Sequence, residues 1–81
     1  MQNKVLDKLM DLMAKGYEVQ MIPDNEGWVQ IRLQKDNYRV ARITRPTLSQ
    51  QVLLMTYEDW FLYELNRLEK EYEHGVKELD A

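Results

Sequence analysis

Residues 28–44, WVQIRLQKDNYRVARIT, decide the fold of this chain. Apolar and polar residues alternate on both sides of Asp36-Asn37, which is the pattern of two half-buried strands joined by a tight turn. The preceding stretch YEVQMI, residues 17–22, alternates in the same way and is followed by PDNEG, which is typical of a turn. Because both connections are short, the sequence predicts three strands that pair antiparallel in a meander.

The length of the hairpin loop sets which face of the third strand points inward. A three-residue loop places Ala41 beside Ile31, whereas a two-residue loop places Arg42 beside Ile31. We predict the three-residue loop, because it collects apolar side chains on one face of the sheet. The residues that this register leaves on the outer face are Trp28, Arg32, Tyr38, Val40 and Arg42.

An amphipathic helix is predicted before the strands. Residues 3–15, NKVLDKLMDLMAK, place apolar side chains on one face at helical spacing and charged side chains on the other. Asn3 can cap the start of this helix, and Gly16 can end it in a left-handed conformation. We expect the internal methionines to fill gaps in the core. They are Met10, Met13, Met21 and Met55.

The C-terminal part is predicted to be helical, in one piece or in two. The proline of Arg45-Pro46 ends the sheet, and residues 47–50, TLSQ, have the form of a capping box from which one helix could run to about Glu73. Alternatively, residues 56–59, TYED, begin a second helix, because they carry a capping threonine and two acids. A short strand over residues 52–55 is a further alternative. Fraying is expected over residues 76–81.

The predicted fold class is therefore α+β. An N-terminal helix precedes a three-stranded antiparallel meander, and one long helix or two follow it, which gives the order αβββα or αβββαα. Residues 1–81 are expected to form a single domain, since a chain of 81 residues is too short for two separate cores.

The composition excludes several classes of protein. The chain has no cysteine, which removes disulfides, iron–sulfur clusters and thiol catalysis. No apolar run reaches the roughly 18–20 residues of a membrane span, and the charges interleaved in residues 1–16 are unlike a secretory signal. We therefore expect a cytoplasmic protein with no membrane partner.

Groups that could carry catalysis or bind a metal are sparse. The chain has one histidine, His74, one serine, Ser49, and three scattered glycines. A metal site needs several ligands of the right type, and nucleophilic catalysis needs a base beside the nucleophile. We therefore expect no enzyme activity, no catalytic residues, no metal and no cofactor.

Three surfaces are candidates for binding a partner. Aromatic and arginine side chains on the outer sheet face could stack on bases and neutralise phosphates, and this candidate nucleic-acid site comprises Trp28, Arg32, Arg39 and Arg42. Residues 47–81 carry eight acidic and three basic side chains. The candidate partner-binding residues of this acidic region are Glu58, Asp59, Glu64, Glu69, Glu71, Glu73 and Trp60. A surplus of apolar surface that could form a homodimer seam comprises Leu53, Leu54, Tyr57, Trp60, Phe61 and Tyr63.

In size, element order and tail charge, the chain resembles small phage-encoded proteins of the anti-CRISPR inhibitor type. The stretches that carry the resemblance are the opening helix to Lys15-Gly16, YEVQMI, WVQIRLQKDNYRVARIT and the closing acidic helix. The resemblance implies a protein that binds a CRISPR nuclease or surveillance complex, often through an acidic surface that occupies a nucleic-acid site. The basic residues between Arg32 and Arg45 depart from that pattern.

Two other families share part of this layout. Three strands followed by a helix resemble the arm-binding domains of phage integrases, which implies DNA contacts by Arg32, Arg39 and Arg42. Double-stranded-RNA-binding domains have the same element order. They begin their last helix with lysines, however, where this chain has TLSQQVLLM.

The leading hypothesis is a non-enzymatic, phage-encoded interaction protein in the cytoplasm of the host cell. It would bind and inhibit a host protein or nucleoprotein complex, such as a CRISPR or other defence effector. The alternatives are a nucleic-acid-binding domain that uses the sheet face and a structural homodimer.

Overall fold

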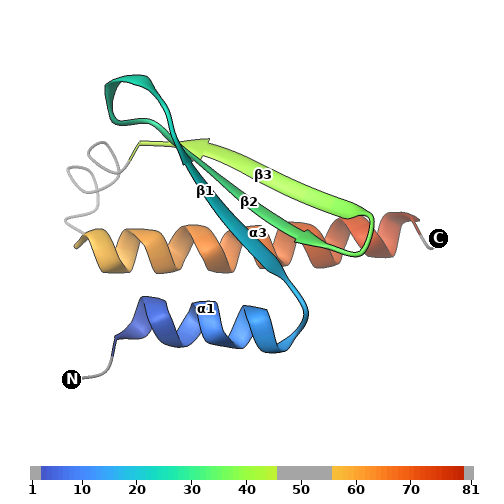
Figure 1. Ribbon diagram of the computed structural model, residues 1–81. Helices are drawn as coiled ribbons and strands as arrows, with labels where there is room; N and C mark the ends of the chain where they lie inside the picture. Colours follow the sequence, from blue (N-terminus) through green and yellow to red (C-terminus); the bar gives the residue numbers. More distant parts are fainter. Residues whose placement is uncertain (1–2, 46–55, 80–81) are drawn as a thin grey trace.

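The computed structural model describes residues 3–45 and 56–79 (Figure 1). The elements follow one another in the predicted order, and the α+β layout with one three-stranded antiparallel sheet is confirmed. They are α1 (Lys4–Ala14), β1 (Glu18–Pro23), a short 3-10 turn η1 (Asn25–Gly27), β2 (Val29–Lys35), β3 (Tyr38–Thr44) and α3 (Tyr57–Leu79).

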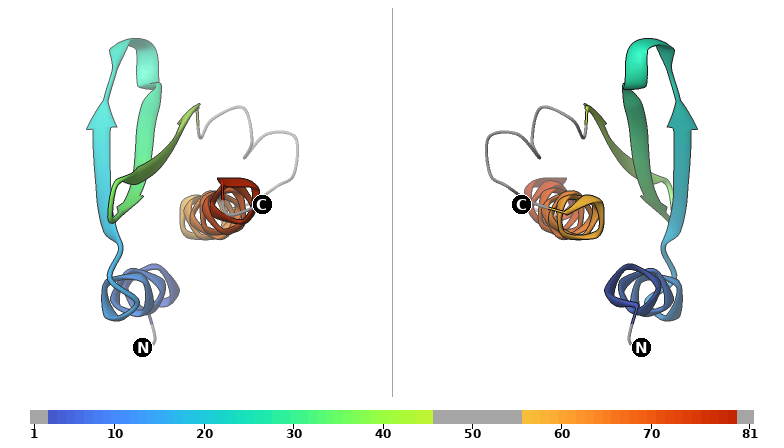
Figure 2. Two further views of the ribbon diagram at one scale, coloured as in Figure 1. Left: turned by 90° about the vertical axis from the view of Figure 1, so that its right-hand side faces the viewer. Right: turned by 90° about the vertical axis from the view of Figure 1, so that its left-hand side faces the viewer.

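The sheet packs on a layer of two helices. Its strand order is β1-β2-β3, so β2 is central and antiparallel to both neighbours. Both helices are seen end-on in Figure 2, so their axes are close to parallel, and Figure 1 shows that they run in the same direction. α1 packs against β1 and α3, whereas α3 packs against β2 and β3.

The core lies between the sheet and the helices. Leu12 of α1, Ile31 and Leu33 of β2, and Leu65 and Leu68 of α3 are completely buried. Removal of this apolar surface from water is the main force that holds the sheet and the two helices together. The other buried apolar residues are Tyr17, Trp60, Phe61 and Tyr72.

The hairpin between β2 and β3 has a different register from the predicted one. Its loop contains two residues, Asp36 and Asn37, and Arg42 lies opposite Ile31. Asp36 has the positive φ, 55°, that favours a two-residue turn. The predicted three-residue loop was therefore wrong. That prediction avoided a charged residue on the inner face, whereas the structure accepts one because Glu64 neutralises it.

As a result, β3 is turned over relative to the prediction. Tyr38, Val40 and Arg42 lie on the inner face of the sheet, and the residues between them lie on the outer face. Ile43, which was expected to be in the core, is on the outer face and 60% exposed. Three of the five residues predicted on the outer face, Tyr38, Val40 and Arg42, are therefore not on it.

Both ends of α1 are formed by the residues that the sequence predicted. The Asn3 side-chain oxygen accepts a hydrogen bond from the backbone N–H of Leu6 at 3.0 Å. After the last turn, Gly16 has a φ of 91°, which is accessible to glycine without strain.

The start of α3 coincides with the second capping signal. The Thr56 hydroxyl accepts a hydrogen bond from the backbone N–H of Asp59 at 3.1 Å, which is the N-cap arrangement. The helix start predicted from TYED is therefore confirmed. The alternative helix start at residues 47–50 and the alternative strand at residues 52–55 lie outside the described residues.

α3 continues beyond its predicted end near Glu73 and passes through Gly75. A glycine inside a helix costs about 1 kcal/mol relative to alanine. Here it has a packing reason, because a side chain at this position would overlap the Tyr38 hydroxyl. Residues 76–79, where we expected fraying, are helical, and residues 80–81 lie outside the described residues.

Candidate interaction surface

Glu64, a candidate for binding a partner, is used inside the molecule. Its side chain is only 2% exposed, and its Oε2 lies 2.6 Å from Nε of Arg42. Because α3 packs over β3, this ion pair joins the helix to the inner face of the sheet. A carboxylate in this position is not available to occupy a phosphate site of another molecule.

Glu69 is also engaged within the fold. Lys8 Nζ donates a hydrogen bond to Glu69 Oε1 at 2.6 Å, and Lys15 Nζ donates one to Oε2 at 2.9 Å. Burial by itself would raise the pKa of this carboxyl, but the hydrogen bonds from the two lysines outweigh burial and lower it. The hydrogen bond that Lys15 donates to Glu69, together with one that it donates to Asp11, raises the pKa of Lys15. These contacts join α1 to α3.

The other acidic candidates are spread along the exposed side of α3. Glu58 and Asp59 lie in its first turn, where they complement the helix dipole. Glu71 lies 3.6 Å from Arg67 one turn away, and Glu73 is exposed. The predicted acidic surface is therefore divided, with two of its six carboxylates internal.

Trp60, the aromatic member of the predicted partner site, belongs to the core. It is 3% exposed and packs edge-on against Phe61 at a centroid distance of 5.9 Å. Tyr57 and Tyr63 of the predicted apolar seam are exposed, whereas Leu53 and Leu54 lie outside the described residues. Of the described seam residues, Trp60 and Phe61 are therefore buried in the core.

The basic candidates do not share one surface. Arg32 and Arg39 lie on the outer sheet face, whereas Arg42 lies on the inner face beside Glu64. Trp28 precedes β2 and is half-buried, with the guanidinium of Arg45 5.7 Å from its ring centre. The structure therefore keeps Arg32 and Arg39 of the predicted nucleic-acid site on one face and places Arg42 on the other.

A cluster of tyrosines holds the far end of α3 to the hairpin. The ring of Tyr72 packs edge-on against Tyr17 and Tyr38, at centroid distances of 5.0 and 5.1 Å. Its hydroxyl donates a hydrogen bond to the backbone carbonyl of Lys35 at 2.6 Å. Burial raises the pKa of both Tyr72 and Tyr17. The cluster has a structural role, because the hydroxyl of Tyr72 is already hydrogen-bonded to the backbone.

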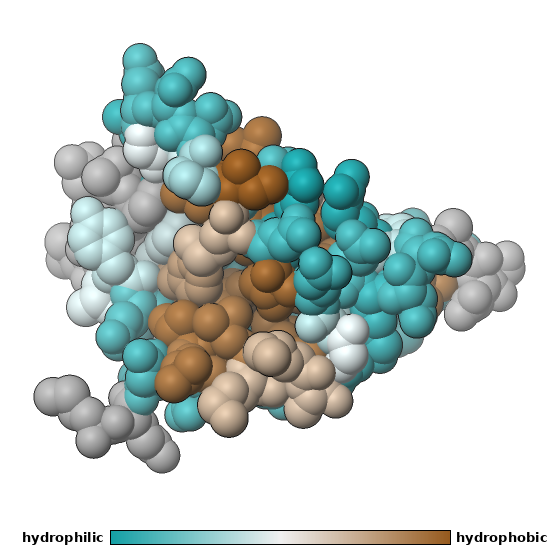
Figure 3. Space-filling model, viewed as in Figure 1, coloured by the Kyte–Doolittle hydropathy of each residue, from teal (hydrophilic) through white to brown (hydrophobic). Residues whose placement is uncertain are grey.

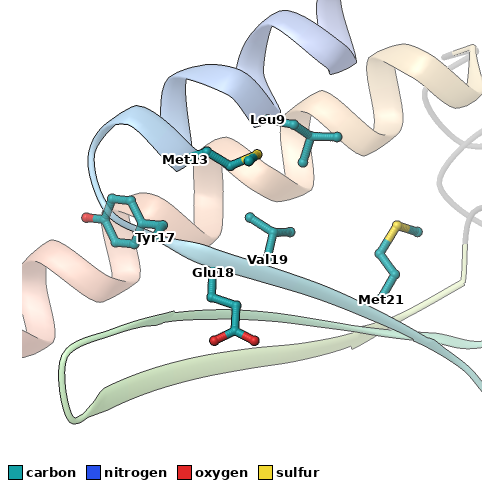
Figure 4. A pocket seen from close by; sticks show the side chains of 6 residues that line it. All are labelled: Leu9, Met13, Tyr17, Glu18, Val19 and Met21. Carbon is teal, nitrogen blue, oxygen red and sulfur yellow. The ribbon is translucent and has the colours of Figure 1, made fainter.

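A different surface, an apolar groove, lies between α1 and β1. Figure 4 shows Leu9 and Met13 of α1 facing Val19 and Met21 of β1, while the Glu18 carboxylate points away. The groove has a volume of about 530 Å³, and Tyr17 also lines it. Small-molecule sites are typically apolar concavities of this size.

The groove is continuous with exposed apolar side chains of α1. Met10 is 60% exposed and Met13 is 68% exposed, and Leu6 and Met21 are about half exposed. Figure 3 shows this apolar surface gathered between α1 and β1. We call it the α1–β1 face, and it comprises Leu6, Leu9, Met10, Met13, Val19 and Met21.

The α1–β1 face was missed because its residues were assigned to the core. The helical periodicity of residues 3–15 correctly predicts one apolar face, but Leu12 alone of this helix is fully buried. The expectation that Met10, Met13 and Met21 fill core gaps is wrong, because all three are about half exposed or more. Met55, the fourth methionine of that prediction, lies outside the described residues. The sequence signal that could have found the surface is the width of the apolar stripe, which exceeds what one small sheet can cover.

The described residues contain no group of three or more His, Cys, Asp or Glu side chains placed to hold a metal ion. Neither of their two helices has both the length and the apolar character needed to cross a bilayer. In comparisons with known proteins, no family model, no curated protein and no solved structure matches this chain.

Proposed function

We propose that this chain is a small non-enzymatic interaction protein that binds another polypeptide through its α1–β1 face. The single observation that carries the proposal is the apolar groove bordered by half-exposed methionine and leucine side chains. Monomeric proteins seldom leave such side chains contiguous on their surface, and an apolar patch with a concave centre is typical of a binding site.

The composition of this face also favours a polypeptide partner. Its methionines are flexible and polarisable, so they can adapt their shape to a partner's side chains. The carboxylates of Glu64 and Glu69 are paired with basic side chains of the same chain. The ionisable groups of the interior thus serve the fold, while the groove offers contact area rather than acid–base chemistry.

The identity of the partner stays a prediction. The resemblance to anti-CRISPR inhibitors suggests a host defence effector. Since Glu64 and Glu69 are internal, we propose that such a partner is engaged by apolar contact rather than by imitation of nucleic-acid charge.

A capture experiment tests this function with a matched pair of variants. Met10→Lys places a charge on the α1–β1 face, and Ile43→Lys places the same charge at a residue of equal exposure, 60%, on the outer sheet face. Immobilised wild-type chain and both variants are exposed to host lysate and to a differently tagged copy of the chain. We expect the wild type and Ile43→Lys to retain the same polypeptides and Met10→Lys to lose them.

Equal retention by all three proteins, or retention of nothing by the wild type, would contradict the proposed function. Circular dichroism of each variant shows whether the helices and the sheet are intact, which separates loss of binding from loss of fold.

A further inference from the structure

The α1–β1 face lies beside an unpaired sheet edge. Among the described residues, β1 pairs with β2 alone, so the backbone N–H and C=O groups along its other edge have no strand partner there. In both views of Figure 2, β1 forms the outer margin of the described part of the molecule. That margin is the side facing the viewer in Figures 1 and 3, where the apolar side chains also gather.

The sequence of β1 does not protect this edge. Exposed edge strands usually carry lysines or other charges that discourage pairing with a further strand. Between Glu18 and Asp24 this strand reads VQMIP, with no charge and a proline only at its end. The opposite edge differs, since β3 carries Arg39 and Arg42 and packs against α3.

We propose that the occupant of the α1–β1 face is a second copy of this chain, whose β1 adds antiparallel to β1 and extends the sheet to six strands. This inference rests on the proposed function of the α1–β1 face and assigns that face to a second copy of the chain in place of a host effector. A two-fold axis perpendicular to the sheet places the same strand and the same apolar face on both sides of the interface, as an isologous dimer requires.

The charges at the ends of β1 select the register. If both copies keep their helices on the same side of the sheet, one residue must lie opposite its own copy. With Met21 on the axis, Glu18 would lie opposite Asp24 of the second copy, and like charges in that position are destabilising. With Gln20 on the axis, Glu18 lies opposite Ile22, and the two Gln20 side chains can hydrogen-bond to each other.

The Gln20 register also completes the groove. Val19 and Met21 lie on the inner face of β1, since they pair with Leu33 and Ile31 of β2. In this register, Met21 of the second copy lies opposite Val19 and covers the apolar opening next to it. The exposed side chains of the two α1 helices lie on the same side of the extended sheet, where they can contact each other.

The interface is small, which sets the expected strength of the dimer. Six residues of strand are about 20 Å long, and the eleven residues of α1 are about 16 Å long. A stable interface covers about 800 Å² of each partner, which is about one-seventh of the 5939 Å² surface of this chain. One short strand and one short helix form a small face, so we expect a dimer that dissociates on dilution.

Disulfide trapping tests the register directly, because the chain contains no cysteine. In Gln20→Cys, the two cysteines would lie directly opposite, at a Cα separation of about 4.5–5.5 Å, which a disulfide can span. Ala41→Cys is the matched control, an exposed position on the outer face of β3. We expect mild oxidation to convert most of the Gln20→Cys protein to a covalent dimer and to leave Ala41→Cys largely monomeric. Equal crosslinking of the two variants, or none in Gln20→Cys, overturns the proposal.

The mass in solution gives an independent test. We expect the wild type and Ile43→Lys to become dimeric with rising concentration. The dimer dissociation constant of Met21→Lys should be at least about tenfold higher, because this substitution places a charge in the paired edge. A wild type that stays monomeric at the highest soluble concentration overturns the dimer. If the wild type is monomeric but retains a lysate polypeptide that Met10→Lys loses, the proposed function stands without the dimer. If the wild type is monomeric and retains nothing, both the dimer and the proposed function are contradicted.

Discussion

Glu69 shows at the residue scale how a carboxylate expected on the surface became part of the fold. It accepts hydrogen bonds from Lys8 and Lys15, which come from the opposite end of the sequence. The sequence of α3 alone does not distinguish Glu69 from a solvent-exposed acid, because its two lysine partners are more than fifty positions away. Arg42 and Glu64 are a second case, and they also explain why the hairpin register was predicted wrongly.

Replacing Glu69 is expected to loosen α1 from α3. Glu69→Gln leaves Lys8 partly buried without its nearer charged partner, since Asp11 is 3.8 Å away, so we expect a loss of about 1–3 kcal/mol in the free energy of unfolding at neutral pH. The pKa of Glu69 is lowered in the fold, so its stabilisation is complete above its ordinary pKa of 4.5 and is lost as the pH falls through the lowered value. Urea unfolding of both proteins between about pH 7 and pH 3 measures this. The difference between them should shrink on acidification, and a constant difference would contradict the assignment.

Gly75 provides a prediction whose sign depends on its neighbour. In an ordinary helix interior, glycine to alanine stabilises by about 1 kcal/mol. Here the added methyl group would overlap the Tyr38 hydroxyl, so we expect Gly75→Ala to lower the thermal midpoint. In a Tyr38→Ala background the same substitution should raise it. A stabilising Gly75→Ala in the wild-type background would show that the tyrosine moves aside without cost.

At the scale of elements, the positions and ends of the helices and strands could be predicted from nearby residues. Contacts between residues far apart in the sequence could not. The strands, the Asn3 cap, the Gly16 end of α1 and the Thr56 cap all follow from residues close together in sequence. The hairpin register depends on whether an inward arginine is neutralised, which only the packing of α3 on β3 decides. The α1–β1 face was missed for the same reason, because an amphipathic pattern does not say how much of its apolar stripe is covered.

The cap of α3 gives an element-scale prediction. Thr56→Ala removes the hydroxyl that accepts from the Asp59 N–H, and we expect the free energy of unfolding to fall by about 1 kcal/mol. Thr56→Ser keeps the hydroxyl and is expected to stay close to the wild type. Chemical denaturation of the three proteins measures both effects, and equal losses in the two variants would show that the methyl group rather than the hydroxyl matters.

At the scale of the whole molecule, the stability of the chain should depend on its own concentration. If two copies associate through β1, mass action stabilises the folded state as the protein concentration rises. We expect the thermal midpoint of the wild type to increase with concentration and that of Met21→Lys to increase less. Differential scanning calorimetry over a concentration series measures this, and parallel behaviour of the two proteins would place the association elsewhere.

The contact of Glu69 with Lys8 closes a loop of about three-quarters of the chain, since the two residues are 61 positions apart in a sequence of 81. The β2–β3 hairpin, by contrast, closes over two residues and can form early. Loop-closure entropy therefore favours a folding order in which the hairpin and α3 come together first and α1 docks last. In stopped-flow experiments, Glu69→Gln should accelerate unfolding far more than it slows refolding, because the helix it anchors is not yet in place at the rate-limiting step.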